Sequence, residues 1–192
     1  SWHNTLGRPH DLFQRAAAMQ EIPNVAVVKM VWRARSLRDN LEAFTLLNSR
    51  QKPMIAMCMG KYGLISRVLA PKFGGFAVYA ACEEHKLTAP DQPTVNVLKS
   101  KYRYDSINSE TNVYGVIGNN VEHSLGPEYH NKEFAAKNIN AVYIPLPINK
   151  EWEQLKATTL ELVNYQTLDF HGASITIPHK VNMLQLVQEK DR

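Results

Sequence analysis

The chain has 192 residues, of which 44% are hydrophobic and 21% are charged, and its formal net charge is +4. This length suits one large domain or two small ones. Lys and Arg are scattered among Asp and Glu, with no basic run, RNA-binding aromatic signature or zinc-finger spacing, which argues against nucleic acid as a partner. Diffuse positive charge instead suits small anionic substrates.

The cysteines and the hydropathy of the sequence indicate its cellular location. Its two cysteines, Cys58 and Cys82, each stand in an apolar stretch, which predicts buried thiols in a reducing compartment. Neither a signal peptide nor an apolar run of membrane-spanning length is present. We therefore expect no membrane association and a cytoplasmic location, or a plastid location for a plant-like source whose transit peptide is absent.

The first part of the chain alternates between strand and helix patterns. It predicts strands over 25–31, 53–59 and 76–81, and helices over 36–48, 63–70 and 94–101, the first of these helices beginning with Ser36 as its N-cap. Strands that alternate with helices in this way are typical of parallel βα units.

The pattern is interrupted near residue 105 and then starts again. A polar, turn-rich stretch without apolar periodicity predicts a linker over 107–112 between domains at 1–106 and 113–192. The second domain is predicted to have strands over 113–118, 141–146 and 172–177 and helices over 127–137 and 150–164, with Pro178 in the first turn of a last helix. The chain is therefore predicted to be α/β throughout.

Lys29 interrupts an apolar, β-branched run in the first predicted strand. One interpretation is a strand residue whose amine reaches solvent along its flexible stem. The other is a Schiff-base nucleophile, because a desolvated lysine is more often neutral and can then attack a ketone. Other polar residues favour the second interpretation. His3, Arg67, Thr88 and Gln92 follow or end successive segments, and we expect them at a common rim, where parallel α/β barrels carry out their chemistry.

These segments resemble the type I 3-dehydroquinate dehydratases. The likeness rests on "SWH", "VVKM", "MGKYGLISR", "FGG" and "TAPDQ", and covers about residues 1–100. It implies the later part of a (βα)8 barrel, whose missing strands these residues would need in order to fold and act. It also implies that Lys29 forms an imine with the substrate ketone and that His3 is the general acid and base.

The same resemblance implies a substrate pocket. Arg67 would clamp the substrate carboxylate, Thr88 and Gln92 would bond to carboxylate or hydroxyls, and Met57 and Met59 would line the pocket. A guanidinium matches a carboxylate in bidentate geometry, which supports the role of Arg67. No metal and no cofactor is implied for this step. Asp91 stands where the family usually has glycine.

The second part resembles the shikimate dehydrogenases over about residues 113–190, through "YGVIGNNVEHSLGPEYHN" and "HGASITIPHK". The resemblance implies that Ser124 holds the shikimate carboxylate, that Ser174 and Thr176 bond to ring hydroxyls, and that Lys180 is catalytic. A positioned ammonium can supply the proton that a ketone needs when it receives hydride. Considered alone, Ser124 is more simply a helix cap and Lys180 a solvated lysine, but the matching motifs in one βα module favour the functional roles.

Two features of this part depart from the dehydrogenase pattern. Gly126 stands in place of a second serine, and Asn119–Asn120 replaces the usual residue–proline pair. The sequence contains no GxGxxG phosphate loop, so the NADP implied by the resemblance is expected to bind to a domain absent from this chain. Three histidines of this part, His123, His130 and His179, lack metal-ligand spacing, and no metal site is predicted.

Taken together, the two resemblances imply consecutive reactions. The first enzyme makes 3-dehydroshikimate from 3-dehydroquinate, and the second reduces it to shikimate, as in bifunctional proteins that join the two. The expected partners are these small molecules. A non-catalytic regulatory protein that senses quinate or shikimate is the main alternative, favoured by Asp91 and Gly126. A scaffold without a ligand is a further one.

Overall fold

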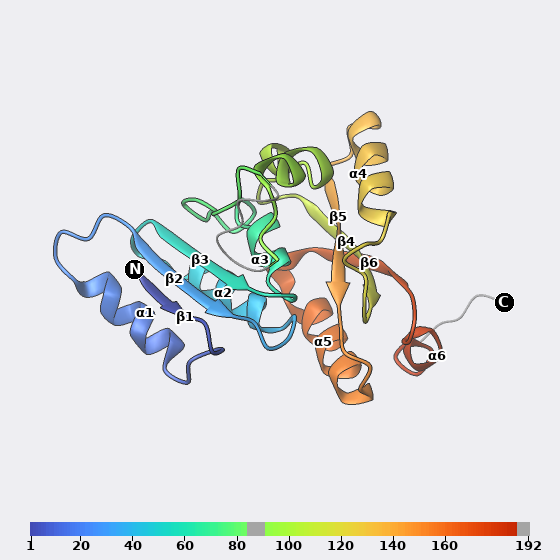
Figure 1. Ribbon diagram of the computed structural model, residues 1–192, viewed down its shortest axis with the longest axis horizontal. Helices are drawn as coiled ribbons and strands as arrows, with labels where there is room; N and C mark the ends of the chain where they lie inside the picture. Colours follow the sequence, from blue (N-terminus) through green and yellow to red (C-terminus); the bar gives the residue numbers. More distant parts are fainter. Residues whose placement is uncertain (84–90, 188–192) are drawn as a thin grey trace. The chain divides into compact units, whose positions relative to one another are not determined.

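The computed structural model describes residues 1–83 and 91–187. The chain divides into two compact units, Ser1–Glu110 and Thr111–Arg192 (Figure 1). Each unit has its own parallel sheet, so the predicted α/β class is confirmed. Among the described residues, no helix has the length and apolar character needed to cross a membrane.

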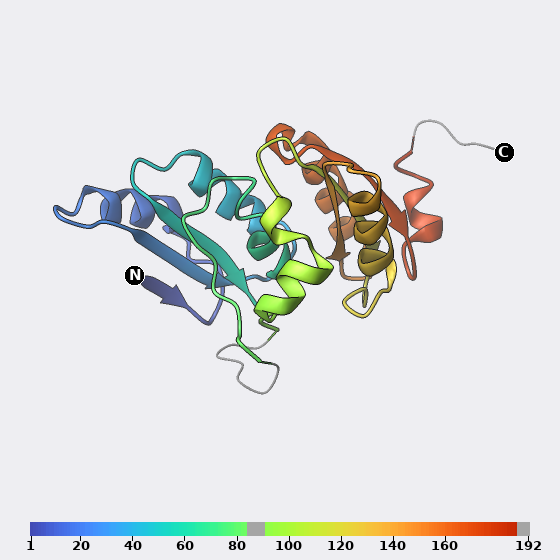
Figure 2. The same ribbon diagram turned by 90° about the horizontal axis from the view of Figure 1, so that it is seen from above.

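The first unit contains a three-stranded parallel sheet in the order β1–β2–β3. Its strands are β1 (Trp2–Asn4), β2 (Val28–Arg33) and β3 (Met54–Met59), and its α-helices are α1 (Leu12–Glu21), α2 (Asp39–Asn48) and α3 (Leu64–Val68). A π-helical turn at Val97–Lys101 and a 3₁₀ turn at Tyr104–Ser106 follow. Figure 2 shows α1 and α2 on the same side of the sheet.

Side-chain alternation gives this sheet two different faces. One face packs on the helices and buries an apolar set: Val28, Met30, Trp32, Met54, Ala56 and Cys58. The opposite face carries His3, Lys29, Val31 and Met57, since His3 pairs with Val31 and Val31 pairs with Met57 in the strand register. A lysine and a histidine therefore project from the face that the helices do not cover.

Several predicted elements of this unit are corrected. Residues 76–81 are not a strand: Phe76 N–H donates to the Met54 carbonyl at 2.9 Å, and only Ala81 forms a bridge, with Thr94. The strand predicted over 25–31 lies at Val28–Arg33. β1 and α1 were not predicted from the sequence.

The predicted start of α2 was also wrong. Ser36 does not cap this helix, which begins three residues later at Asp39. The Asp39 carboxylate instead accepts the backbone N–H of Arg35 at 2.7 Å. This side chain joins the end of β2 to the helix, so the chain turns before the helix begins.

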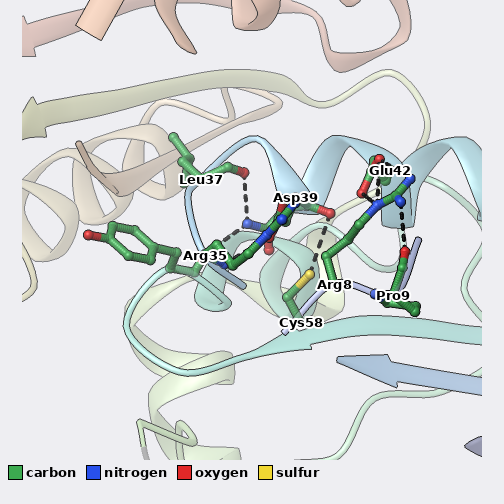
Figure 3. A network of polar contacts seen from close by, with 9 residues as sticks. Arg8, Pro9, Arg35, Leu37, Asp39, Glu42 and Cys58 are labelled. Carbon is green, nitrogen blue, oxygen red and sulfur yellow. Dashed lines mark hydrogen bonds and ion pairs between the residues drawn. The ribbon is translucent and has the colours of Figure 1, made fainter. Parts of the chain in front are cut away.

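Charged side chains join the segments around α2 (Figure 3). Arg8 donates to both oxygens of Glu42 at 2.8–3.1 Å, and this hydrogen bonding raises the pKa of Arg8. The Cys58 thiol lies 3.5 Å from the Asp39 carbonyl oxygen, and its complete burial raises the pKa of Cys58. That thiol is therefore unreactive. Cys82 is exposed, contrary to the prediction of two buried thiols.

Asn40 is fully buried and joins α2 to α3. Its Nδ2 donates to the carbonyls of Leu37 and Tyr62 at 2.8 Å, and its Oδ1 accepts Ser66 N–H at 3.3 Å. The Ser66 hydroxyl in turn donates to Gly63 and accepts the N–H of Cys58. Because Arg67 follows Ser66, this network sets where Arg67 lies.

We expect Asn40→Leu to lower the free energy of unfolding by about 2–4 kcal/mol, because it leaves two carbonyls and one N–H buried without these partners. Urea denaturation of the protein measures the loss. Asn96→Leu is the matched control, since Asn96 is exposed in a helical turn, and it should change stability by less than about 0.5 kcal/mol. Equal effects of the two substitutions would contradict the role given to Asn40.

The second unit contains a parallel sheet in the order β5–β4–β6. Its strands are β4 (Asn112–Gly118), β5 (Ala141–Pro147) and β6 (Phe170–Ile175), and its α-helices are α4 (Gly126–Ala136), α5 (Trp152–Asn164) and α6 (Lys180–Met183), with a 3₁₀ turn at Gln166–Leu168. Figure 2 shows α4 and α5 on opposite sides of the sheet. All three strands end at the same edge, from which the loops to the helices leave.

Two contacts attach α4 to this sheet. Phe134 packs on the cluster of Val116, Val121 and Tyr143. Asn131 accepts the Tyr143 N–H at 2.7 Å and donates to its carbonyl at 2.8 Å, which satisfies the free edge of β5. The prediction for Pro178 is corrected: the Ile177–Pro178 peptide is cis, and α6 begins only at Lys180, so the proline precedes the helix.

Candidate active site

Lys29 is the second residue of β2 and is half-buried, so it lies on the sheet face and not at the carboxyl edge of the strand. Its Nζ is 3.5 Å from the centroid of the Tyr79 ring. A cation over an aromatic face is attracted by the ring electrons. The tyrosine therefore holds the lysine amine against the face that carries Val31 and Met57.

Arg67 reaches the same tyrosine from α3. Its Nη1 donates to the Tyr79 carbonyl at 2.7 Å and lies 3.1 Å from the sulfur of Met57. The side chain is only 4% exposed, and burial lowers the pKa of Arg67, although a guanidinium stays charged at neutral pH. No carboxylate of the described residues forms an ion pair with it. A buried guanidinium of this kind is suited to a carboxylate ligand.

His3 lies on β1, opposite Val31, and is exposed. Partial desolvation, followed by the positive charges of Lys29 and of the amino terminus, lowers the pKa of His3. The influence of Lys29 places these two side chains in one electrostatic neighbourhood. A neutral imidazole at physiological pH is ready to accept a proton.

The charge of Lys29 should be measurable at His3. We expect the pKa of His3 to lie below 6.5 and to rise in Lys29→Met, because the substitution removes a cation that opposes protonation. An NMR titration of the imidazole measures both values. Lys52→Met is the control, because Lys52 donates to the Ile22 carbonyl elsewhere in the unit. If the pKa of His3 is the same in Lys29→Met and in the wild type, the charge of Lys29 does not act on His3, and the prediction is contradicted.

The remaining predicted residues of the first unit are less closely joined. Met59 is half-buried and packs on Val31, Ile55 and Met57. Gln92 is buried, one residue before Pro93, whose carbonyl accepts the N–H of Ala81. Thr88 lies outside the described residues. The structure therefore brings together Lys29, Arg67 and Met57, with His3 on the same face.

Sequence reasoning missed Tyr79, which contacts both Lys29 and Arg67. It stood in a predicted strand, where an aromatic residue is most simply a packing residue. Tyr79 is instead 50% exposed. Its isolated position in the sequence carried no signal, since its two partners are 50 and 12 residues away.

In the second unit, a cavity of about 330 Å³ opens at the carboxyl edge of the sheet. The loops that follow all three strands contribute to it: its lining residues are Asn119, Asn120, Lys150, Thr176, Ile177 and Pro178. In open parallel sheets, ligands bind at this edge. The cavity is therefore the candidate ligand site of this unit.

Thr176 is the one predicted site residue in the cavity lining. Its N–H donates to the Ile117 carbonyl at 2.9 Å, which continues the pairing of β6 with β4. A Cβ on Gly118 would lie 2.5 Å from the Thr176 methyl carbon, so only glycine leaves room for this side chain. Gly118 thus lets the threonine reach the end of β4.

Ser124, Ser174 and Lys180 lie outside this lining. The hydroxyl of Ser124 accepts the Gly126 N–H at 3.2 Å, in the turn that leads into α4, whose N-cap residue is Leu125. Ser174 is exposed on β6, and Lys180 is exposed at the first residue of α6. The sequence did not point to Lys150 as a lining residue. Apart from its position shortly after β5, nothing in the sequence distinguishes it from other surface lysines.

His179 is fully buried between these residues, and its Nε2 lies 2.9 Å from the Ile148 carbonyl oxygen. It therefore joins the segment of Thr176 and Lys180 to the loop that follows β5. In the described part of the chain, no group of three His, Cys, Asp or Glu side chains is placed to hold a metal ion.

Parallel sheets with alternating helices, charged side chains on one sheet face and a polar cavity at one sheet edge define an α/β protein with two candidate ligand sites. Residues 1–109 match the family model described as type I 3-dehydroquinase, and the chain belongs to that family. Residues 116–192 match the model described as shikimate dehydrogenase substrate binding domain. Both resemblances found in the sequence are thus confirmed.

Curated relatives contain both parts in one polypeptide. The bifunctional 3-dehydroquinate dehydratase/shikimate dehydrogenase, chloroplastic, of Arabidopsis thaliana is 36% identical over 193 residues, which are 100% of this chain and 31% of the relative. The shikimate biosynthesis protein AroDE of Chlamydia pneumoniae is 33% identical over 144 residues, 73% of this chain and 28% of the relative. The chain thus spans less than a third of the length of these relatives.

Proposed function

We propose that this chain is part of a bifunctional shikimate-pathway enzyme. The first unit contributes to the dehydration of 3-dehydroquinate to 3-dehydroshikimate, and the second contributes to the NADP-dependent reduction of 3-dehydroshikimate to shikimate. The observation that carries the proposal is the placement of Lys29 and Arg67 on one tyrosine at one sheet face. An amine and a buried guanidinium that contact the same tyrosine suit a substrate with both a ketone and a carboxylate.

In the proposed dehydration, the neutral amine of Lys29 attacks the ketone carbon, His3 gives a proton to the former carbonyl oxygen, and that oxygen leaves as water to give an iminium ion. The iminium withdraws electrons, so His3 can remove a proton from the neighbouring carbon and form an enamine. The enamine then expels the hydroxyl group one carbon further on, which leaves as water after taking a proton from His3. A second water hydrolyses the imine and frees Lys29. Arg67 holds the carboxylate throughout.

In the proposed reduction, Thr176 binds a ring hydroxyl in the cavity of the second unit, and Lys180 holds a proton for the carbonyl oxygen that becomes an alcohol. The reduced cofactor, NADPH, would supply the hydride when bound. The residues of this unit do not fit NADP, since the chain has no Gly-rich phosphate loop before a helix. We propose that another part of the enzyme binds it. Ser124 and Ser174 would contact the substrate only once it extends beyond the cavity.

We propose the domains to be residues 1–106 and 113–192, with 107–112 between them. A cytoplasmic or plastid location accords with the proposal, because the Arabidopsis relative is named chloroplastic. A regulatory sensor has no support among the relatives, which carry enzyme or biosynthesis names.

The test uses the protein that contains these residues together with its flanking chain. With 3-dehydroquinate it should form the conjugated enone of 3-dehydroshikimate, which is followed by ultraviolet absorbance. With shikimate it should reduce NADP⁺. Binding of both compounds without either turnover would instead support the sensor.

A further inference from the structure

The segment that carries Lys180, the proposed proton donor, has few buried residues. Of the described residues 177–187, only His179 and Met183 are buried, and Lys180 itself is exposed. The N–H of Met183 donates to the His179 carbonyl at 2.8 Å, so the two side chains lie one helical turn apart on the same side of α6. The position of Lys180 therefore depends on what these two side chains contact.

One hydrogen bond to the backbone anchors the ring of His179. The ring is fully buried, and its Nε2 lies 2.9 Å from the Ile148 carbonyl oxygen. A carbonyl oxygen only accepts hydrogen bonds, so Nε2 carries the hydrogen. The other ring nitrogen, Nδ1, has no hydrogen-bond partner among the described residues. Within the part of the chain that the structure describes, the bond to Ile148 is thus the only polar contact of this ring.

The acceptor of this bond is itself fixed by the sheet. Ile148 is buried directly after β5, and its N–H donates to the Gly118 carbonyl at 2.8 Å, where β4 ends. The backbone N–H of His179 donates to the Thr176 carbonyl at 2.9 Å, and the N–H of Thr176 donates to the Ile117 carbonyl at 2.9 Å. The ends of all three strands are thus linked, and the His179 ring links the loop after β5 to the segment after β6.

We propose that His179 is a positioning residue of the dehydrogenase site: through its bond to the Ile148 carbonyl, its ring sets where the amine of Lys180 lies relative to Thr176. This inference rests on the proposed function. The histidine transfers no proton to the substrate, because its ring is fully buried. Thr176 keeps its place without the ring, since its own N–H bonds to β4. Loss of the ring should therefore impair proton transfer and spare substrate binding.

The test compares His179→Gln, His179→Asn and His179→Leu with the wild type in the protein that contains this unit and its flanking chain. Glutamine has an N–H donor at the position of Nε2, whereas asparagine is shorter and leucine has no donor. The asparagine and leucine variants should lower kcat for the NADP-dependent oxidation of shikimate about 10–100-fold, the scale on which a small misplacement acts. Their KM should change by less than about threefold. The glutamine variant should keep most of kcat.

A solvent isotope effect distinguishes misplacement from a loss of folded protein. A displaced Lys180 slows the proton transfer, so the solvent deuterium isotope effect on kcat should increase in His179→Asn and His179→Leu. A smaller folded fraction lowers the rate but leaves this isotope effect unchanged. His171→Leu is the matched control, because His171 is exposed on β6, and it should change neither quantity. If His179→Leu does not fold, the glutamine and asparagine variants make the same comparison.

An unchanged kcat in His179→Asn overturns the inference, and so does an isotope effect equal to that of the wild type. A loss of kcat in His179→Gln as large as in His179→Asn also overturns it. Should the wild type not oxidise shikimate at all, the proposed function fails, and hydrogen exchange then tests the anchor separately. The amides of residues 180–186 should exchange faster in His179→Asn than in His179→Gln, and equal rates overturn the inference.

Discussion

Lys29→Met is expected to abolish the dehydration of 3-dehydroquinate, with a loss on the order of 10⁴-fold or more, the scale on which removal of an essential nucleophile acts. The reason is chemical: without the amine no iminium forms, and the proton next to the ketone stays too weakly acidic for an imidazole to remove. The measurement is the rate of enone formation by the protein with its flanking chain.

Borohydride tests the same residue independently of turnover. Reduction in the presence of 3-dehydroquinate should leave a secondary amine on Lys29, visible as an added mass on the peptide that contains it. Lys29→Arg is the control for charge, because it keeps a cation over the Tyr79 ring but cannot form an imine. If this arginine variant turned over or the adduct appeared on another lysine, Lys29 would not be the nucleophile.

Lys180→Ala is expected to lower kcat for the NADP-dependent oxidation of shikimate about 10²–10⁴-fold, which is the usual contribution of a positioned general acid or base. Binding should be largely spared, because Lys180 lies outside the cavity lining, so the dissociation constant of shikimate should change by less than about threefold. Steady-state kinetics and calorimetry give the two numbers.

The control for Lys180 is Lys156→Ala, an exposed helical lysine in the same unit. Both variants remove one positive charge, so a shared loss would reflect net charge and not chemistry. Loss of shikimate binding with unaltered kcat would make Lys180 a binding residue and leave the proton donor unassigned.

Most strands were predictable because each is an apolar run bounded by turn residues. β3 and β5 begin within one residue of their predicted starts, since both are buried and read as nearly continuous apolar sequence. Residues 76–81 are also an apolar run, but they do not form a β-strand. There the Tyr79 carbonyl accepts a hydrogen bond from Arg67, and the ring packs against Lys29. A contact from a distant helix replaced the strand pairing that the local sequence favours.

In the candidate sites, too, local sequence patterns predicted some residues, and contacts between distant segments decided the others. The sequence pointed to Lys29, Arg67 and Thr176 through local patterns, and the structure places the first two at Tyr79 on one sheet face and Thr176 in a cavity lining. It pointed equally to Ser174, which lies exposed on β6 outside the cavity. Nothing local distinguished Lys150, because its role in the lining depends on two loops from other strands.

The sequence by itself determined the α/β class, the two modules and the residue types available for chemistry, because these follow from hydrophobic periodicity and short patterns within a few residues. Only the tertiary structure decided that Tyr79 joins Lys29 to Arg67, and that Lys150 shares a cavity with Thr176. Such groupings depend on how parallel strands pair and where their loops lie, and the free energy of that pairing comes from contacts between residues far apart in the chain.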